Sequence, residues 1–166
     1  MKKLVVELTL NGAERQMLVL PGATLLDTLR EQGLTGTRRG CDQGACGACT
    51  VLVDGAPMMS CLLPVETIEG ARIATIEGLT PAAGLHPIQQ AFLDGFATQC
   101  GFCTSGMIMA TAGLLAENPV PTREDAVRAI SGNICRCTGY AAIIDAVLDA
   151  ADRVRAAETP AKAKVA

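Results

Sequence analysis

The sequence predicts an α+β protein in two parts, a small sheet domain followed by a helical domain. Short alternating segments rich in Val, Leu and Thr fill the first half, whereas the second half places apolar residues at helical spacing. The composition changes at residues 78–84, Gly-Leu-Thr-Pro-Ala-Ala-Gly, which is typical of a linker. We therefore expect domains over residues 1–78 and 79–158, with residues 159–166 as a disordered tail.

The first half is predicted to hold two hairpins and a short helix. Asn11 and Gly12 favour a type I′ turn, because both central positions of that turn need a positive φ. Thr24 and Asp27 form a capping-box pattern that opens a helix. The predicted elements are strands over residues 3–10 and 15–20, a helix from 24 to 33, a hairpin over 50–61 with its turn at Asp54 and Gly55, and a last strand over 71–76.

The second half is predicted to form four helices. Pro87 suits the first turn of the first helix, and Phe96 is expected on its apolar face with Phe92. Thr122 and Asp125 repeat the capping-box pattern before the third helix. The predicted helices cover residues 87–96, 107–116, 122–130 and 141–156.

The bulk composition excludes several classes of function. The chain has 14 basic and 17 acidic residues and a net charge of −3, without a basic stripe, so we expect no nucleic-acid partner. Glu7 interrupts the only apolar run near the N-terminus, and no run is long enough to cross a membrane. The sequence thus predicts a cytoplasmic protein without membrane insertion.

Four of the eight cysteines form a first set in the sheet domain: Cys41, Cys46, Cys49 and Cys61. Four, two and eleven residues separate them, which is the plant-type ferredoxin spacing of a 2Fe-2S cluster. The loop is rich in Gly and Ala, as expected where backbone N–H groups have to point at negatively charged sulfurs without obstruction by side chains. The first set therefore predicts one 2Fe-2S cluster.

The other four cysteines form a second set in the helical domain: Cys100, Cys103, Cys135 and Cys137. Each pair precedes a predicted helix, so two helix N-termini would face one anionic cluster. Cys135 and Cys137 need a turn between them, because residues i and i+2 point to opposite sides of an extended strand. Spacing alone favours a second 2Fe-2S cluster but leaves structural zinc open.

Other cysteine chemistry fits less well. Zinc sites usually use paired knuckles, which neither the first loop nor the Cys135–Cys137 pair resembles. His86 is the only histidine, so a Rieske centre is excluded, and no histidine follows a C-x-x-C pair as covalent haem would require. Disulfides do not suit a cytoplasmic protein, and no cysteine is left over as a nucleophile.

Three motifs together resemble the small iron–sulfur subunit of the molybdenum hydroxylases, the xanthine oxidase family. They are GCDQGACGACTV at residues 40–51, QCGFCT at 99–104 and NICRCTGY at 133–140. The resemblance covers roughly residues 5–148. One departure is Ser105, where many relatives have Pro; since Ser also suits the first turn of a helix, we expect cluster binding to be kept.

The resemblance implies a β-grasp, plant-type ferredoxin-like domain followed by a four-helix bundle, each with one 2Fe-2S cluster. It implies a large subunit with the molybdopterin cofactor, where substrate is oxidised, and a medium subunit with FAD. Electrons would pass from molybdenum through the second cluster and then the first to FAD. Gln99 and Cys137 would contact the pterin. A dimer of heterotrimers is the family's usual assembly, and no residue of this chain is expected to be catalytic.

Three functions compete on the sequence alone. The first is the electron-transfer subunit just described, whose substrate could be an aldehyde, an N-heterocycle, carbon monoxide or a similar molecule. The second is a free-standing ferredoxin-like carrier with structural zinc in the helical half. The third is a non-redox interaction module with zinc in both sets.

Overall fold

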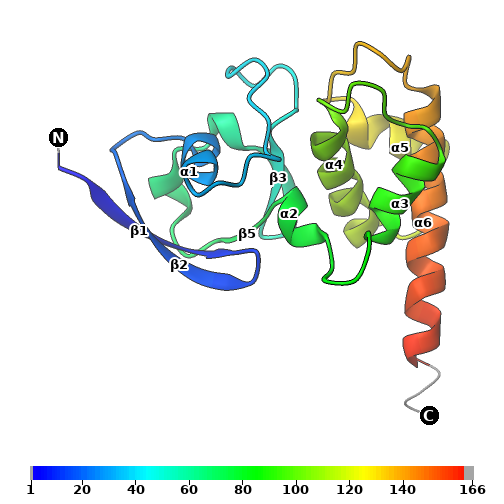
Figure 1. Cartoon of the computed structure of the whole chain (residues 1–166), viewed down its shortest axis with the longest axis horizontal. Helices are drawn as coiled ribbons and strands as arrows, with labels where there is room; N and C mark the ends of the chain where they lie inside the picture. Colours follow the sequence, from blue (N-terminus) through cyan, green and yellow to red (C-terminus); the bar gives the residue numbers. More distant parts are fainter. Residues whose placement is uncertain (1, 163–166) are drawn as a thin grey trace.

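The computed structural model describes residues 2–162 of the chain. A sheet part and a helical part lie side by side, and the last helix projects beyond the others (Figure 1). The predicted α+β arrangement of a sheet domain and a helical domain is confirmed.

Five strands form one mixed sheet in the order β2-β1-β5-β3-β4. Strand β1 pairs with β2 antiparallel and with β5 parallel, and β3 pairs antiparallel with both β4 and β5. The strands are β1 (Leu4–Leu10), β2 (Ala13–Val19), β3 (Thr50–Val53), β4 (Ala56–Met59) and β5 (Arg72–Ala74). Strands β1 and β3, which lie far apart in the sequence, are thus joined through β5.

Both hairpins turn where the sequence predicts. Asn11 and Gly12 have φ of 50° and 81°, and Asp54 and Gly55 have φ of 50° and 87°. These four left-handed residues match the requirement of type I′ turns, whose twist suits the flanking strands. In contrast to these two tight turns, residues 36–49 form a long loop in the sheet part.

Helix α1 (Leu25–Glu31) packs against the sheet and begins at the predicted cap. The Thr24 Oγ1 accepts a hydrogen bond from the Asp27 N–H at 3.1 Å. Leu25 and Leu29 are fully buried in a core with Val51 and the strands. Two short 3₁₀ turns, η1 (Ser60–Leu62) and η2 (Val65–Ile68), follow β4 and bring Cys61 beneath this helix.

The last strand is shorter than predicted. It ends at Ala74 because the Asn11 side chain accepts a hydrogen bond from the Thr75 N–H at 2.9 Å and thereby replaces a strand partner. A short helix, α2 (Ile76–Leu79), begins next and overlaps the start of the predicted linker. Ile76 and Leu79 pack against the helical core, so α2 is the junction between the two parts.

Four longer helices form the second part, with bounds α3 (Pro87–Asp94), α4 (Thr104–Glu117), α5 (Arg123–Ile130) and α6 (Ala141–Lys162). They share one core, to which Phe92, Met107, Ile130, Ile143 and Val147 contribute buried side chains. Within residues 2–162, no helix is long and apolar enough to span a bilayer.

The helix ends differ from the predictions in three places. Phe96 lies outside α3 with φ of 51° and is 84% exposed, because the helix closes with the Ala97 N–H on the Phe92 carbonyl. Helix α4 begins at Thr104, directly after Cys103. Helix α6 continues to Lys162, since its Ala-rich sequence favours helix, whereas residues 163–166 of the predicted tail lie outside the described residues.

Helix α4 joins the two parts. It packs against β3 of the sheet as well as against α3 and α5. At Gly113 a side chain would not fit, because a Cβ there would lie 2.7 Å from Cδ of Pro57 in β4. The absence of a side chain on this face of α4 therefore lets the helix lie directly on the sheet part.

His86 gives a pH-dependent prediction. Its Nδ1 accepts the Ile88 N–H at 3.3 Å and caps α3, which requires the neutral ring, and burial lowers the pKa of His86. Because the folded state binds this proton less well, the contribution of the neutral His86 cap to stability is fully present above about pH 6.5 and is lost as pH falls below that value through the lower folded pKa. His86 is the only histidine of the chain, and an NMR titration should give it a lower pKa in the folded protein than in the protein unfolded by urea.

A His86→Asn variant is the matched control, since Asn also caps helices but does not titrate. Its free energy of unfolding should fall less than that of the wild type between pH 7.5 and pH 5.5. Equal losses in the two proteins, or a raised His86 pKa, would contradict this account of the cap.

Candidate functional site

Three loops carry the predicted site residues other than Cys61, which lies in η1, and all three loops lie at one end of the molecule. They comprise residues 36–49 of the sheet part and residues 95–103 and 131–140 of the helical part (upper edge of Figure 1). The first loop lies beside the other two, so segments 86 positions apart in the sequence meet here.

The first cysteine set meets in pairs. The Cys41 side chain interacts with that of Cys46, and the Cys61 side chain interacts with that of Cys49. Cys49 and Cys61 are buried, whereas Cys41 and Cys46 are partly exposed. Ser60, fully buried, donates its hydroxyl to the Cys49 carbonyl at 2.8 Å and so holds Cys61 against Cys49.

Small residues shape the first loop, as the sequence predicts. A Cβ on Gly40 would lie 2.7 Å from the Cys46 Sγ, and a Cβ on Gly44 would lie 2.4 Å from the Leu62 side chain. The Ala45 N–H donates to the Cys41 Sγ at 3.3 Å. The loop therefore wraps closely around its sulfurs and directs backbone donors toward them.

The loop stabilises thiolate unevenly. Backbone N–H groups of Gln43 and Ala45 lower the pKa of Cys41 to about 7. Burial raises the pKa of Cys61. A bound metal favours the deprotonated form of each ligand, so the buried side of the set depends on the metal for its charge.

The second cysteine set also meets in pairs. The Cys137 thiol donates to the Cys100 Sγ at 3.5 Å, and both residues are exposed. The Cys103 and Cys135 thiols are the other pair of partners, and Cys103 is buried. All four line a cavity of about 240 Å³, whose other walls include Phe102 and the first-set residue Cys46.

The thiols of the second set differ in acidity. Burial raises the pKa of Cys103 to about 12. Burial also opposes ionisation of Cys135, but hydrogen bonds from Thr138 outweigh it and lower the pKa of Cys135 to about 7. The Phe102 N–H lowers the pKa of Cys100, and the hydrogen bond with Cys100 raises the pKa of Cys137.

The paired arrangement suits the chemistry of a 2Fe-2S cluster. Each iron of such a cluster takes two protein ligands, so four cysteines have to approach in twos. Each set provides two such pairs, so each donor set fits the two irons of one cluster.

Hydrogen bonds join the first loop to the second set. The Ile134 N–H donates to the Cys46 carbonyl at 2.9 Å, and the Asn133 Nδ2 donates to the Gly47 carbonyl at 2.8 Å. Ser105, the residue that replaces the usual Pro, donates its hydroxyl to the Gly36 carbonyl at 2.7 Å. The two sets are thus held in one framework.

Sequence reasoning did not find the roles of Asn133 and Tyr140. The Tyr140 hydroxyl accepts from the Cys135 N–H at 2.8 Å and donates to the Asn133 carbonyl at 3.2 Å. Asn133 reads as an ordinary turn residue after Gly132, yet only 5% of it is exposed. The only signal in the sequence is their position inside the cysteine motif, which by itself assigns no partner.

Gln99 lies at the surface beside the exposed Cys100. Cys137 lies against Cys100, so the three residues share one exposed edge of the second set. Within residues 2–162, no side-chain hydrogen bond uses the Gln99 amide.

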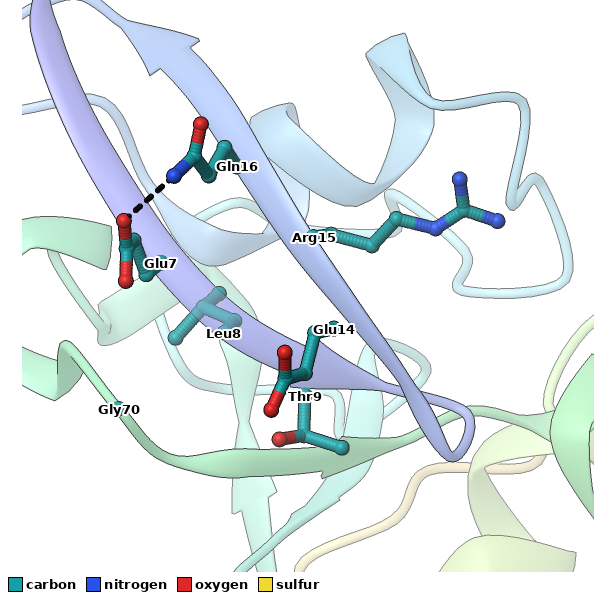
Figure 2. Close-up of a pocket in the computed structure, with 7 residues that line it drawn as sticks. All are labelled: Glu7, Leu8, Thr9, Glu14, Arg15, Gln16 and Gly70. Carbon is teal, nitrogen blue, oxygen red and sulfur yellow. Dashed lines mark hydrogen bonds between the residues drawn. The ribbon is translucent and has the colours of Figure 1, made fainter.

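A larger hollow of about 430 Å³ lies elsewhere, on β1 and β2 (Figure 2). It is lined by seven residues: Glu7, Leu8, Thr9, Glu14, Arg15, Gln16 and Gly70. Glu7 and Gln16 are bonded to each other across the strands at 2.6 Å, and no predicted site residue faces the hollow. The cysteine loops, not this hollow, are the candidate site.

Comparison with known families agrees with this geometry. Residues 8–74 match the family described as "2Fe-2S iron-sulfur cluster binding domain", and residues 75–148 match the "[2Fe-2S] binding domain" family. Each half of the chain is therefore a 2Fe-2S-binding domain, and zinc in either half is not supported.

The relatives decide the family. The chain is 47% identical over 150 residues to the nicotine 6-hydroxylase small subunit of Paenarthrobacter nicotinovorans, which covers 90% of each protein. It is 47% identical over 149 residues to the xanthine dehydrogenase iron-sulfur-binding subunit of Escherichia coli O157:H7, which covers 88% of this chain and 93% of that subunit. The chain belongs to the small iron–sulfur subunits of the molybdenum hydroxylases.

Solved structures place these subunits in the same fold. A chain of quinoline 2-oxidoreductase from Pseudomonas putida 86 superposes with a TM-score of 0.90 and 46% identity, covering 95% of this chain and 99% of that one. As a molybdenum hydroxylase small subunit, the protein is the electron-transfer component of an oxidoreductase.

A glycine substitution tests the contact between the loops. Gly47 has φ of 66°, and a Cβ there would lie 2.4 Å from the Gly132 carbonyl. Gly47→Ala should therefore lower the free energy of unfolding by about 2 kcal/mol more than backbone strain alone. Urea unfolding of the loaded protein measures this difference.

Gly55→Ala is the matched control, because Gly55 is equally left-handed but a Cβ there would meet nothing within 4 Å. This variant should cost only the strain, about 1–2 kcal/mol. Equal losses for Gly47→Ala and Gly55→Ala would show that the loops do not press on each other at Gly47.

Proposed function

We propose that this subunit carries electrons from a molybdopterin centre in a large partner subunit, through its second and then its first 2Fe-2S cluster, to FAD or another acceptor. The proposed ligands are Cys100, Cys103, Cys135 and Cys137 for the second cluster and Cys41, Cys46, Cys49 and Cys61 for the first. When bound, each cluster accepts and gives up one electron at a time.

The exposed edge of the second set supports the proposed direction of electron transfer. Cys100, Cys137 and Gln99 all face solvent, whereas Cys49 and Cys61 of the first set are buried. An electron donor outside the chain can approach the second set most closely there. We propose that Gln99 and Cys137 contact the pterin at this edge.

The connection between the sets supports transfer within the chain. Cys46 belongs to the first set, and its carbonyl accepts the N–H of Ile134, the residue before Cys135. One hydrogen bond therefore links the backbone of a first-set ligand to the residue directly before a second-set ligand. Phe102 and Cys46 wall the same cavity as the second set, which keeps the intervening space apolar.

The partners and substrate form part of the proposal. Besides the large subunit we propose a medium FAD subunit, assembly as a dimer of heterotrimers, and a cytoplasmic location. Substrate is oxidised in the large subunit, and an aldehyde, N-heterocycle or carbon monoxide would all suit the chemistry. The relatives named above belong to enzymes named for nicotine, xanthine and quinoline, and similar relatives belong to aldehyde oxidoreductases, so the names support both an N-heterocycle and an aldehyde.

The finer fold assignment is proposed as well. The mixed sheet with α1 packed on it supports a β-grasp, plant-type ferredoxin-like domain over residues 1–78. The shared core of α3, α4, α5 and α6 supports a four-helix bundle over residues 79–158. Helix α2 is the junction, since Thr75 is bonded to Asn11 while Ile76 and Leu79 reach the helical core.

The metal content of the purified subunit tests the proposal. It should contain about four irons and four acid-labile sulfides per chain and show two distinct EPR signals when reduced. Cys137→Ser should perturb one signal, and Cys61→Ser should perturb the other. Zinc without sulfide would refute the proposed function, and equal perturbation of both signals by Cys137→Ser would refute separate ligand sets.

The Gln99→Leu variant tests the proposed contact between Gln99 and the pterin. Because the Gln99 side chain lies at the surface rather than in the core, this change should leave both EPR signals intact and weaken association with the large subunit. Co-purification of the complex measures the second effect, and unchanged association would argue against Gln99 at that interface.

A further inference from the structure

We propose that Asn133 is a positioning residue that couples the two cluster sites, so that a loaded first site slows loss of the cluster from the second. The inference rests on the proposed function, because it requires a cluster in each set. It adds an energetic link between sites that the electron path alone does not require.

The contacts of Asn133 span both sets. Its Nδ2 donates to the Gly47 carbonyl at 2.8 Å and reaches the Thr50 Oγ1 at 3.3 Å, while its own carbonyl accepts the Tyr140 hydroxyl. Gly47 lies between the ligands Cys46 and Cys49, and Thr50 follows Cys49 directly. One buried side chain is therefore bonded to both flanks of a first-set ligand from a position two residues before Cys135.

The first loop also fills the space between the two halves of the second set. A Cβ on Gly106 would lie 2.4 Å from the Gly47 carbonyl, and a Cβ on Gly47 would lie 2.4 Å from the Gly132 carbonyl. Gly106 follows Cys103, and Gly132 precedes Cys135. The Gly47 peptide is thus held between the segments that carry Cys103 and Cys135.

The route continues from Asn133 to the second-set sulfurs. Its carbonyl is bonded to the Tyr140 hydroxyl, which in turn accepts the Cys135 N–H at 2.8 Å. Ile134 closes the same turn against the Cys46 carbonyl at 2.9 Å. A displacement of residues 46–50 therefore moves the acceptors that fix Cys135.

These contacts explain why a cluster bound at one site should affect how firmly the other site holds its cluster. Four thiolates hold the 40–49 loop in a single curved form only while a cluster joins them, and without it residues 46–50 gain freedom. The acceptors for Asn133 and Ile134 then move, and Cys135 loses its fixed position. Because coupling between sites is reciprocal, a loaded second site stabilises the first by the same factor.

The experiment follows cluster loss in the full-length, loaded subunit. An iron chelator is added, and the two EPR signals report separately how fast each cluster is lost. Cys61→Ala, which removes the first cluster, should speed loss of the second about tenfold. Asn133→Ala should speed loss of both clusters, and adding Cys61→Ala to it should cause little further change in the second.

Asn118→Ala is the matched control. Asn118 ends α4 away from both sets, where it bonds Val120 and Asp125, so the effect of Cys61→Ala should stay about tenfold in this background. If Asn133→Ala does not fold, Asn133→Asp keeps the size of the side chain and removes its amide donor, and the same loss of coupling is expected.

The outcomes separate this inference from the proposed function. Suppose that the wild-type subunit holds four irons and four sulfides, but Cys61→Ala does not change the rate at which the second cluster is lost. This result would overturn the proposed coupling and leave the proposed electron-transfer function intact. Full coupling retained in both Asn133 variants would show that Asn133 does not carry it. A chain that holds no sulfide at all would instead refute the proposed function.

Discussion

The constraint on which the structure depends is the approach of thiolates in pairs. Charged sulfurs of like sign repel, so a protein has to supply donors and metal before four of them share one small volume. Here the donors are backbone N–H groups such as those of Gln43, Ala45 and Phe102. Loops with little side-chain bulk follow directly from this requirement, and the rest of each half serves as a rigid frame for its loops.

The frame is continuous across the two halves. Helix α4 begins directly after Cys103, lies on β3, and meets Pro57 at a position where only glycine fits. Ser105 in its first turn is bonded to Gly36 of the first loop. The helix that starts at one cluster site therefore also fixes the angle at which the other site is presented. The sheet and helical domains act as one unit at their cysteine-bearing end.

Local patterns predicted most of the framework. The Asn11-Gly12 and Asp54-Gly55 turns, the Thr24 and Thr122 caps and the four helices are decided by neighbouring residues, and the structure has them at the expected places. Cysteine spacing assigned the cysteines to two sets, but it did not show which side chains pair, because Cys100 and Cys103 meet Cys137 and Cys135 from a separate loop. What spacing could not supply was the contact between the sets. Asn133 meets Gly47 across 86 positions, and no period or motif in a single sequence encodes such a partner.

The errors have the same origin. Phe96 was placed on a helix face by its spacing, but the carbonyl of Phe92 is capped by Ala97 instead, and the ring turns outward. The strand at residues 71–76 was cut short by a side chain 64 positions away. In each case a hydrogen bond that closes an element decided its end, and hydrophobic periodicity does not report such bonds.

The unequal exposure of the two sets also places an order on how the complex is built. Cys100 and Cys137 are exposed beside Gln99, whereas Cys49 and Cys61 are buried within the subunit. In the proposed assembly, the large subunit covers that exposed edge. On that proposal, iron and sulfide reach the second set in the free small subunit, and cluster insertion precedes docking.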